Sequence, residues 1–322
     1  VLGVAVRAAL TISFIGLKRG LFTGQGPAQC GPVRFDDLGV PHTVHGALEP
    51  DARRYTGADR GRLLAPRPRT AHKGHFGHVL VIGGAAGFAG AARMAAEAAA
   101  RTGAGLVSCA VGPGQAGLIS AARPEIMARE VADAEALKPL LERATVLAVG
   151  PGLGTGDWSR SLLQAALDAG RPLVLDADAL NLLAQTPQRR EDWVLTPHPG
   201  EAARLLGETT AAVQQDRFDA ATRLTERYGG VVVLKGAGTL IATPDRPPAL
   251  IDAGNPGMAS GGMGDVLTGL IAGLLAQGLE PFAAARLGAW LHATAADRAA
   301  GFGERGLLAT DLLPELRSLL NP

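Results

Sequence analysis

The sequence predicts an α/β fold in which a central, mostly parallel sheet is covered by helices on both faces. From His78 onward, short apolar runs alternate with longer runs of helical periodicity. The apolar runs, such as Val79–Ile82 and Val231–Leu234, lack alternating polar residues, which is typical of strands buried on both faces. Glycine-rich turns follow several of these runs. Ligands of such folds bind outside the carboxyl ends of the strands, so we expect these turns to converge on one crevice.

The predicted elements follow one another in a regular order. The predicted strands are Val79–Ile82, Leu106–Val111, Val146–Val149, Leu173–Leu175, Val194–Leu195, Val231–Leu234, Leu240–Ile241 and Leu250–Ile251. The predicted helices are Ala91–Arg101, Ala134–Glu142, Ser159–Leu167, Ala179–Leu183, Glu201–Leu206, Ala211–Tyr228, Asp265–Gln277, Pro281–Ala300 and Asp311–Leu320. Glycines such as Gly103 and Gly170 directly follow helical runs, as is usual at helix ends.

The first 72 residues differ from the rest. Residues 1–41 contain two short β-like runs, Leu10–Ile15 and Val33–Phe35, which are too little to bury a core alone. We expect them to be the tail of a preceding domain, and the start at Val1 without methionine suggests a fragment of a longer polypeptide. Residues 42–72, rich in Pro, Arg and Gly, are predicted to be a linker that wraps onto the next domain. Residues 73–322 would form the main domain.

Composition excludes several classes of function. The chain has 322 residues, 47% of them hydrophobic, and a formal net charge of +1, so no nucleic-acid partner is expected. No apolar run reaches the roughly 18 residues of a membrane span, so no membrane partner is expected either. Cys30 and Cys109 lie far apart and indicate a reducing, cytoplasmic location rather than a disulfide framework or zinc site.

The stretch Asn255–Gly273 carries the strongest functional signal. Gly261, Gly262 and Gly264 precede an apolar helical run, so a flexible loop is expected to lead into a buried helix. The free N–H groups and the dipole of such a helix start bind phosphate readily. Asp265 at this point suits a general base that deprotonates a hydroxyl group attacking phosphorus. The spacing alone is equally compatible with Asp265 as a helix N-cap.

Two further glycine loops follow predicted strands. Gly83–Gly90 precedes Ala91 and lacks the GxGxxG spacing of a dinucleotide fingerprint. It predicts either close helix–sheet packing or a backbone platform for a flat ligand, with Ala91 small enough for close approach. Gly150–Gly156 is either a simple turn or a wall of the same crevice, and its place at a strand end favours the wall.

Two loops carry candidate polar contacts. In Thr196–Glu201, two prolines hold His198 at a strand end, where it has either a structural role or a substrate contact. No second histidine lies at ligand spacing, so metal binding by His198 is not expected. Lys235–Thr239, sequence KGAGT, follows a buried strand and suits a nucleotide contact, although it is not a Walker loop. The alternative is that Lys235 merely extends to the sheet edge.

Asp176 and Asp178 end another strand. They could cap the next helix or face a ligand, and a role with magnesium phosphate through water is a further hypothesis. No G-x-S-x-G motif is found, so a serine-hydrolase elbow is not expected. The metal ligands themselves are not predicted.

Seven motifs occur in a fixed order along the chain: GHVLVIGG, GAARMAAEAAARTGAGLV, AVGPGLG, LDADALNLL, TPHPGE, VVLKGAGT and GNPGMASGGMGDVLTGLIAGLLAQG. Together they closely resemble the ADP-dependent NAD(P)H-hydrate dehydratases of the ribokinase-like superfamily. The resemblance covers about Lys73 to Asn321 and implies a ribokinase-like fold. It also implies a repair lyase that dehydrates the S epimer of hydrated NADH or NADPH, with ADP converted to AMP and phosphate.

The resemblance also implies site residues. Asp265 would be the base, with Gly262 and Gly264 forming the anion hole. Ala91, Gly154 and His198 would hold the hydrated dinucleotide beside Asp265. The adenine nucleotide site would comprise Lys235, Gly236, Ala237, Gly238, Thr239 and Gly264. Magnesium is implied by the phosphoryl chemistry, and a homotetramer by the family.

The N-terminal stretch has a second resemblance. RAALTISFIGLKRGLFTGQGPAQCGPVRFDDLGVP is similar to the last part of the NAD(P)H-hydrate epimerase domain. The glycine loop and catalytic segment of that domain would lie before Val1. A bifunctional parent is therefore expected, and no epimerase activity is predicted for these residues.

Two other functions are weighed against the dehydratase. A ribokinase-like kinase of a small vitamin-like alcohol would leave a stable phosphorylated product and would normally prefer ATP. A non-catalytic nucleotide sensor would bind adenine nucleotide without turnover, and the presence of Asp265 argues against it.

Overall fold

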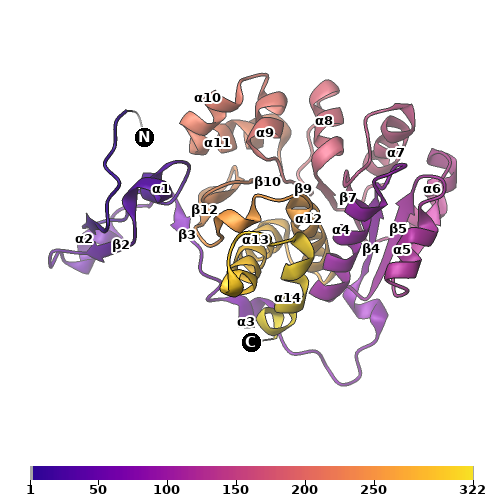
Figure 1. The fold of residues 1–322 in the computed structure, drawn as a ribbon, viewed down its shortest axis with the longest axis horizontal. Coiled ribbons are helices and arrows are strands. Elements are labelled where there is room, and N and C mark those ends of the chain that lie inside the picture. The colour runs from indigo at the N-terminus through magenta and orange to yellow at the C-terminus, as the bar shows by residue number, and fades with distance from the viewer. Residues whose placement is uncertain (1–2, 322) are drawn as a thin grey trace.

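A ten-stranded sheet forms the centre of the molecule, and all but two of its neighbouring strand pairs are parallel (Figure 1). The computed structural model describes residues 3–321. In spatial order the strands are β3 (Arg53–Arg54), β12 (Arg246–Ile251), β11 (Thr239–Thr243), β10 (Val231–Leu234), β9 (Trp193–Leu195), β8 (Leu173–Leu175), β7 (Val146–Val149), β4 (His78–Ile82), β5 (Leu106–Val111) and β6 (Met127–Glu130). The antiparallel pairs are β10–β11 and β11–β12, and the edge strands of the sheet are β3 and β6.

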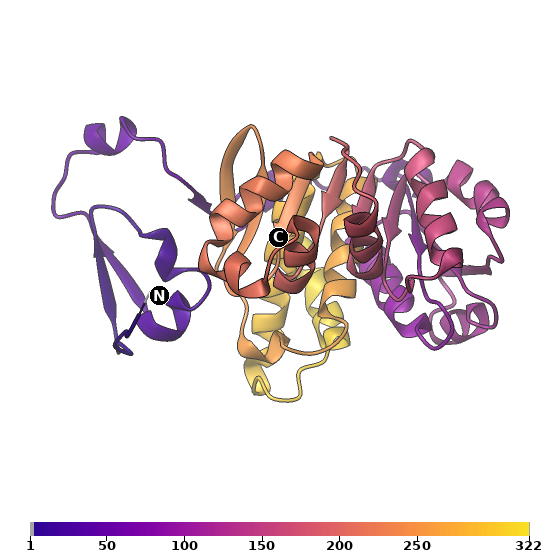
Figure 2. The ribbon, with the colours of Figure 1, turned by 90° about the horizontal axis from the view of Figure 1, so that it is seen from above.

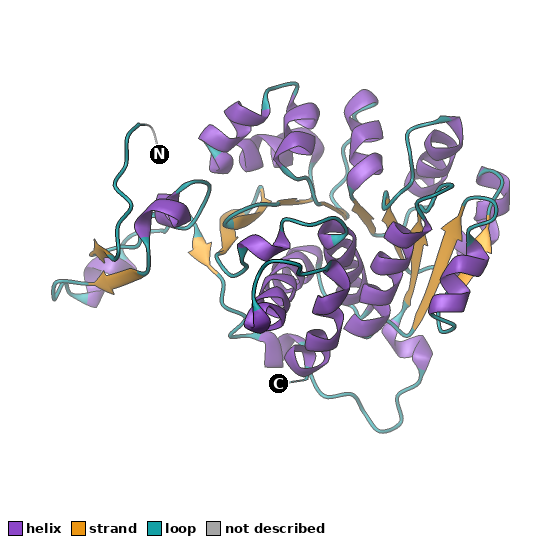
Figure 3. Cartoon of the chain, in the orientation of Figure 1, coloured by secondary structure: helices purple, strands orange, loops and turns teal. Residues whose placement is uncertain are grey.

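Helices cover both faces of this sheet, as predicted (Figure 3). One face is packed against α4 (Ala89–Thr102), α5 (Ala116–Ala122), α12 (Met263–Ala276), α13 (Pro281–Ala299) and α14 (Leu312–Leu320). The other carries α6 (Ala134–Arg143), α7 (Asp157–Asp168), α8 (Ala177–Gln185), α9 (Pro199–Leu206), α10 (Thr210–Gln215) and α11 (Arg217–Tyr228). Short 3₁₀ helices lie at Arg19–Leu21, Lys73–Phe76, Pro256–Met258, Ala300–Phe302 and Ala309–Asp311.

The period of two along each strand divides the interior into two cores. In β4, Val79 and Val81 face one core while Leu80 and Ile82 face the other, and all four are fully buried. The other parallel strands repeat this division. Burial on both faces explains why these strands show no polar alternation in the sequence.

Glycines on α12 allow it to pack unusually close to α4. A Cβ atom added at Gly269 would lie 2.0 Å from the carbonyl oxygen of Ala95, and one at Gly273 would lie 2.8 Å from that of Ala99. The alanine-rich surface of α4 therefore fits directly against the glycines of α12. This contact fixes the start of α12, and with it the glycine loop before the helix, relative to the sheet.

The predicted strands and most helices are confirmed, and one helix is wrong. The predicted helix Ala211–Tyr228 is divided into α10 and α11 because Asp216 adopts an extended backbone and caps α11 by accepting from the N–H of Asp219. The element α5 and the edge strand β6 were not predicted. Three of the four β6 residues are exposed, and their sequence, MARE, contains no apolar run to detect.

The N-terminal residues lie to one side of the main body (Figure 2). The strands β1 (Thr11–Phe14) and β2 (Val33–Asp36) form a separate two-stranded parallel sheet, joined through α1 (Gly26–Cys30). After α2 (His42–Gly46), the chain reaches the edge of the large sheet as β3 and continues into α3 (Arg60–Leu63). The ion pair between Asp59 and Arg286, 2.6 Å, ties this stretch to α13.

Within residues 3–321 no helix is both long enough and apolar enough to span a bilayer.

Candidate active site

Four candidate side chains lie near the carboxyl ends of neighbouring parallel strands or at the start of α12. Asp176 follows β8, His198 follows β9 and Lys235 follows β10. Asp265 is in the first turn of α12. Because β8, β9 and β10 are adjacent in the sheet, their C-terminal loops meet at one edge, as the fold class predicts.

A buried network joins Asp176 to Lys235. The Nζ atom of Lys235 donates to Oδ1 of Asp176 over 2.7 Å, and Oγ1 of Thr268 donates to Oδ2 over 2.8 Å. Burial alone would raise the pKa of Asp176, but the charge of Lys235 and these hydrogen bonds lower it below its ordinary value. Asp176 is therefore an anion that holds the ammonium group of Lys235 in place. The alternative, that Lys235 merely extends to the sheet edge, does not describe this inward-bonded position.

Glu201 is a second carboxylate beside Lys235. Its Oε2 atom lies 3.8 Å from Nζ of Lys235 and accepts from the backbone N–H of His198 over 2.7 Å. Burial, with a smaller contribution from the charge of Asp176, raises the pKa of Glu201. Burial by itself would lower the pKa of Lys235, but the charges of Asp176 and Glu201 outweigh it and raise that pKa.

His198 is the N-cap of α9. Its Nδ1 atom accepts from the N–H groups of Gly200 and Glu201, at 3.0 and 3.4 Å. Burial, together with the nearby charge of Lys235, lowers the pKa of His198 and favours the neutral ring that this capping requires. His198 therefore has the structural role of capping α9. The half-exposed ring leaves Nε2, 3.4 Å from Oε1 of Glu201, at the surface of the site.

Asp265 does not cap its helix. The N-cap of α12 is Gly262, whose φ of 91° lies in the left-handed region, and Asp265 is the third helical residue. Burial and then the negative charge of Asp176 raise the pKa of Asp265 to about 7, against the opposing charge of Lys235. A carboxylate with this pKa is well matched to proton abstraction near neutral pH.

Backbone N–H groups of α12 accompany this carboxylate. Met263, Gly264 and Asp265 occupy the first turn, where N–H groups have no carbonyl partner within the helix. A Cβ atom at Gly264 would lie 3.2 Å from Nζ of Lys235 and 3.3 Å from Oδ2 of Asp176. The first turn of α12 therefore packs directly on the Lys235–Asp176 pair. The helix dipole and the ammonium group together favour an anion here.

In the loop between β10 and β11, the carbonyl groups are hydrogen-bonded to the protein and three successive N–H groups are not. Each carbonyl oxygen from Leu234 to Gly238 accepts a hydrogen bond from a protein donor. Within the described chain, no protein acceptor is found for the N–H groups of Gly236, Ala237 and Gly238. Successive free N–H groups form a concave site for anions such as phosphate.

Arg217 on α11 organises this loop from behind. The side chain is buried, with the residue only 3% exposed, and burial lowers the pKa of Arg217 to about 10. Its Nη2 atom donates to the carbonyl oxygens of Leu234, Lys235 and Gly238 at 3.1, 3.2 and 3.3 Å. Because carbonyl and N–H point in opposite directions across a peptide plane, the bond to the Lys235 carbonyl directs the N–H of Gly236 away from Arg217.

The remaining predicted substrate residues lie on the β4, β7 and β8 side of the same edge. A Cβ atom at Gly152 would lie 3.2 Å from Cβ of Ala91, so the glycine loop after β7 contacts the start of α4. In that loop the N–H of Gly154 donates to Oδ2 of Asp178 over 2.8 Å. Gly262, in turn, contacts Met94 of α4. These contacts join Ala91 in α4 to the loops that contain Gly154 and Gly262.

Sequence reasoning missed three residues of this arrangement. Glu201 was included in the TPHPGE motif without a predicted role, and only His198 of that motif was predicted to contact the substrate. Thr268 lies within an apolar helix, where a hydroxyl group is a weak hint of an internal partner. Arg217 gave no signal at all, because an arginine in a polar helix is usually exposed.

Metal binding by protein side chains alone is not supported. Among residues 3–321 no group of three or more His, Cys, Asp or Glu side chains is arranged to hold a metal ion. The two carboxylate oxygens of Asp176 accept from Lys235 and Thr268. One oxygen of Asp178 accepts from Gly154, and the other has only a 3.4 Å contact with Asn181.

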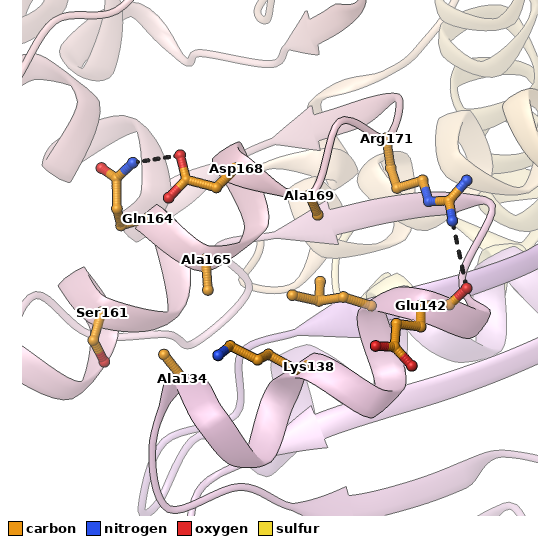
Figure 4. Close-up of a pocket in the computed structure, with 10 residues that line it drawn as sticks. Ala134, Lys138, Glu142, Ser161, Gln164, Ala165, Asp168, Ala169 and Arg171 are labelled. Atoms are coloured by element: carbon orange, nitrogen blue, oxygen red, sulfur yellow. Dashed lines mark hydrogen bonds between the residues drawn. The ribbon is translucent and has the colours of Figure 1, made fainter.

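A groove of about 620 Å³ lies between α6 and α7, away from these residues (Figure 4). Its polar groups bond to local neighbours: Gln164 to Asp168 over 2.9 Å, and Arg171 to the carbonyl oxygen of Glu142 over 3.4 Å. They do not converge on a common point. The candidate residues therefore gather at the strand ends and not at this groove.

Comparison with known proteins gives consistent similarities. Residues 79–317 match the family model described as NAD(P)H-hydrate dehydratase. The chain is 56% identical to a bifunctional NAD(P)H-hydrate repair enzyme of Coxiella burnetii, over 99% of the chain and 66% of that protein. It is 43% identical to an ADP-dependent (S)-NAD(P)H-hydrate dehydratase of Neisseria meningitidis, over 80% of the chain and 90% of that protein. The chain thus spans slightly less than two thirds of the bifunctional relative.

Among solved structures, the fold is similar to an ADP/ATP-dependent NAD(P)H-hydrate dehydratase of Bacillus subtilis that was co-crystallised with ATP and Mg²⁺. The TM-score is 0.75 at 30% identity, covering 84% of this chain and 99% of the other. A hydroxyethylthiazole kinase of Pyrococcus horikoshii, with a TM-score of 0.56 at 16% identity, shares the fold. The predicted ribokinase-like architecture is confirmed.

Proposed function

The chain belongs to the NAD(P)H-hydrate dehydratase family, and from this premise we propose that it dehydrates the S epimer of hydrated NADH and NADPH, using ADP as the phosphoryl donor. The observation that carries the proposal is Asp265. Its carboxylate has a pKa of about 7 and stands beside the first turn of α12 and the ammonium group of Lys235. This combination suits a base next to an anion site.

The chemistry proceeds in two steps. Asp265 accepts the proton of the hydroxyl group on the hydrated nicotinamide ring, and the oxygen attacks the terminal phosphorus of ADP, releasing AMP. The C–O bond of the resulting phosphate ester then breaks. The lone pair of the ring nitrogen supplies electrons, phosphate leaves, and loss of a proton from the neighbouring carbon restores the ring double bond. Phosphate is a far better leaving group than hydroxide, which explains the use of ADP.

The residues divide between three tasks. The N–H groups around Gly262 and Gly264 would stabilise the charge on the transferred phosphoryl group. Residues Lys235 to Thr239 would hold the adenine nucleotide, whose phosphates suit the free N–H groups of this loop. Ala91, Gly154 and His198 would position the hydrated dinucleotide. Lys235, held by Asp176, supplies the positive charge between these regions.

Magnesium enters the proposal with the nucleotide. Mg²⁺ commonly binds through substrate phosphates, water and one or two carboxylates, so it does not require a cluster of protein ligands. Asp178, which lies at the site edge, would be its protein contact through water. The ion would neutralise phosphate charge during transfer.

Three wider predictions belong to the same proposal. Residues 1–41 would be the end of an epimerase domain, residues 42–72 a linker and residues 73–322 the dehydratase domain. The protein would act in the cytoplasm on small molecules only, as a homotetramer. Within a longer bifunctional protein, the epimerase would supply the S epimer from the R epimer.

The test is an assay of hydrated NADPH with ADP, ATP or no nucleotide. Recovery of the absorbance of reduced nicotinamide, with release of AMP and phosphate in equal amounts to product, supports the dehydratase. A stable phosphorylated product would instead identify a kinase of the ribokinase-like type, and nucleotide binding without turnover would identify a sensor. Either result would overturn the proposal.

A further inference from the structure

The N-terminal segment of the chain is bonded directly to the loop that we assign to the nucleotide. The hydroxyl group of Thr23 donates to the carbonyl oxygens of Ala237 and Gly238, at 3.1 and 3.2 Å. The N–H of Gly24 donates to the carbonyl oxygen of Ala237 over 3.0 Å. These two residues thus supply the protein donors for the Ala237 carbonyl, which lies between the free N–H groups of the loop.

Thr23 also bonds to the arginine behind the loop. Its Oγ1 atom accepts from Nε of Arg217 over 2.9 Å. Nη1 of Arg217 donates to Gln214 over 2.8 Å, and Nη2 donates to the loop carbonyls. All the partners of this buried guanidinium are neutral oxygens. Losing the Thr23 hydroxyl would therefore leave a buried, charged N–H without a partner, which is costly.

The contact requires glycine at one loop position. A Cβ atom at Gly238, where φ is 65°, would lie only 1.9 Å from the carbonyl oxygen of Phe22 and 2.7 Å from Cα of Thr23. Phe22 itself packs against the buried core cluster that includes Phe218, and the guanidinium of Arg19 lies 4.7 Å from the centre of the Phe218 ring. The N-terminal segment therefore contacts the loop and α11 through apolar packing and hydrogen bonds, and the close approach requires glycine at position 238.

We propose that residues 21–26 form a structural part of the nucleotide site and that Thr23 is a positioning residue for the loop Lys235–Thr239. Thr23 and Gly24 hold the loop carbonyls inward, and the loop N–H groups then face the phosphates. This inference rests on the proposed function, because it assumes that the loop binds ADP. It places a control point of the dehydratase in the N-terminal segment, outside the part matched by the family model.

ADP binding and docking of residues 21–26 must affect each other equally. If docking of residues 21–26 strengthens ADP binding, then ADP must strengthen the docking by the same factor. Any partner or upstream structure that pulls this segment away would weaken nucleotide binding. ADP would in turn reduce local opening of the segment, which hydrogen exchange detects at the N–H of Gly24.

The experiment compares three variants of the full chain. Thr23→Val keeps the side-chain shape and removes the hydroxyl group, whereas Thr23→Ser retains it. Thr11→Val is the matched control: the Thr11 hydroxyl donates to the carbonyl oxygen of Cys30 over 2.6 Å, in the same N-terminal segment and away from the loop. ADP affinity is measured by calorimetry, kcat and KM by nicotinamide absorbance, and exchange at Gly24 by mass spectrometry with and without ADP.

We expect Thr23→Val to weaken ADP binding and raise KM for ADP about fivefold to thirtyfold, with a much smaller change in kcat, because a few hydrogen bonds are lost. Thr23→Ser should bind ADP nearly as the unsubstituted protein does, as should Thr11→Val. ADP should slow exchange at Gly24 in the unsubstituted protein. Thermal unfolding of each variant checks that the fold is intact.

Two outcomes would overturn the inference. If Thr23→Val and the unsubstituted protein bind ADP with equal affinity, the inference is overturned and the proposed function is not. The same holds if ADP does not change the rate of hydrogen exchange at the N–H of Gly24. Failure of the unsubstituted protein to bind ADP or to dehydrate the hydrate would instead overturn the proposed function, and the inference with it. The two failures are therefore distinguishable by the unsubstituted protein.

Discussion

Replacing Asp265 by Asn should inactivate the protein and stabilise its fold. The pKa of Asp265 is about 7 in the folded chain against an ordinary value of 3.8. A carboxyl group with a raised pKa ionises more readily in the unfolded chain, so its ionisation favours unfolding. The difference corresponds to at most about 4 kcal/mol, and partial exposure of the side chain reduces this figure.

The pH dependence has a definite sign. The destabilisation by Asp265 is absent below about pH 4, where the carboxyl group is protonated in both states. It grows as the pH rises towards the folded pKa of about 7 and is constant above it. The gain in free energy of unfolding for Asp265→Asn should therefore be largest above neutral pH and should vanish in acid.

The assay is denaturant unfolding at a series of pH values, together with turnover of hydrated NADPH. We expect Asp265→Asn to lose roughly 10²- to 10⁴-fold in kcat while ADP affinity is largely retained. Asp168→Asn is the control, because Asp168 is exposed on α7 and, among residues 3–321, its side chain bonds only to Gln164. Its stability should change by less than about 0.5 kcal/mol. Lower stability of Asp265→Asn at every pH, or retained turnover, would refute the reasoning.

Three other predictions concern residues around Asp265. Asp176→Asn should move the acidic limb of the pH profile of kcat/KM to lower pH, because the negative charge of Asp176 raises the pKa of Asp265. The charges of Asp178 and Glu201 also raise this pKa and remain in the variant. An acidic limb at an unchanged pH would contradict this prediction. His198→Asn should preserve thermal stability, since Asn also caps helices, yet raise KM for the hydrate about tenfold, which steady-state kinetics would test. Gly269→Ala should lower the free energy of unfolding by about 1–3 kcal/mol, because the added methyl would meet the carbonyl oxygen of Ala95 at 2.0 Å; unchanged denaturation curves would disprove it.

Much of the fold was readable from local pattern. Strands such as Val146–Val149 are apolar throughout and bounded by turns, so their position in the sequence was sufficient to find them. The break at Asp216 was missed because helical propensity continues across it, and capping by a single side chain decides the outcome. The polar edge strand β6 was missed because its pairing with β5 depends on residues far away in the chain.

Local pattern was enough to predict that the glycine loops converge at one edge of the sheet, because loops that follow parallel strands leave them at the same end. It also indicated Asp265, Lys235 and His198 as residues of interest. The ionisation of Asp265 and the conformation of the loop around Lys235 could be read only from the folded structure. The pKa of Asp265 depends on burial and on the charge of Asp176, and the conformation of the KGAGT loop depends on Arg217 and Thr23, all distant in sequence. Electrostatic and hydrogen-bonding effects act through space, so no local pattern encodes them.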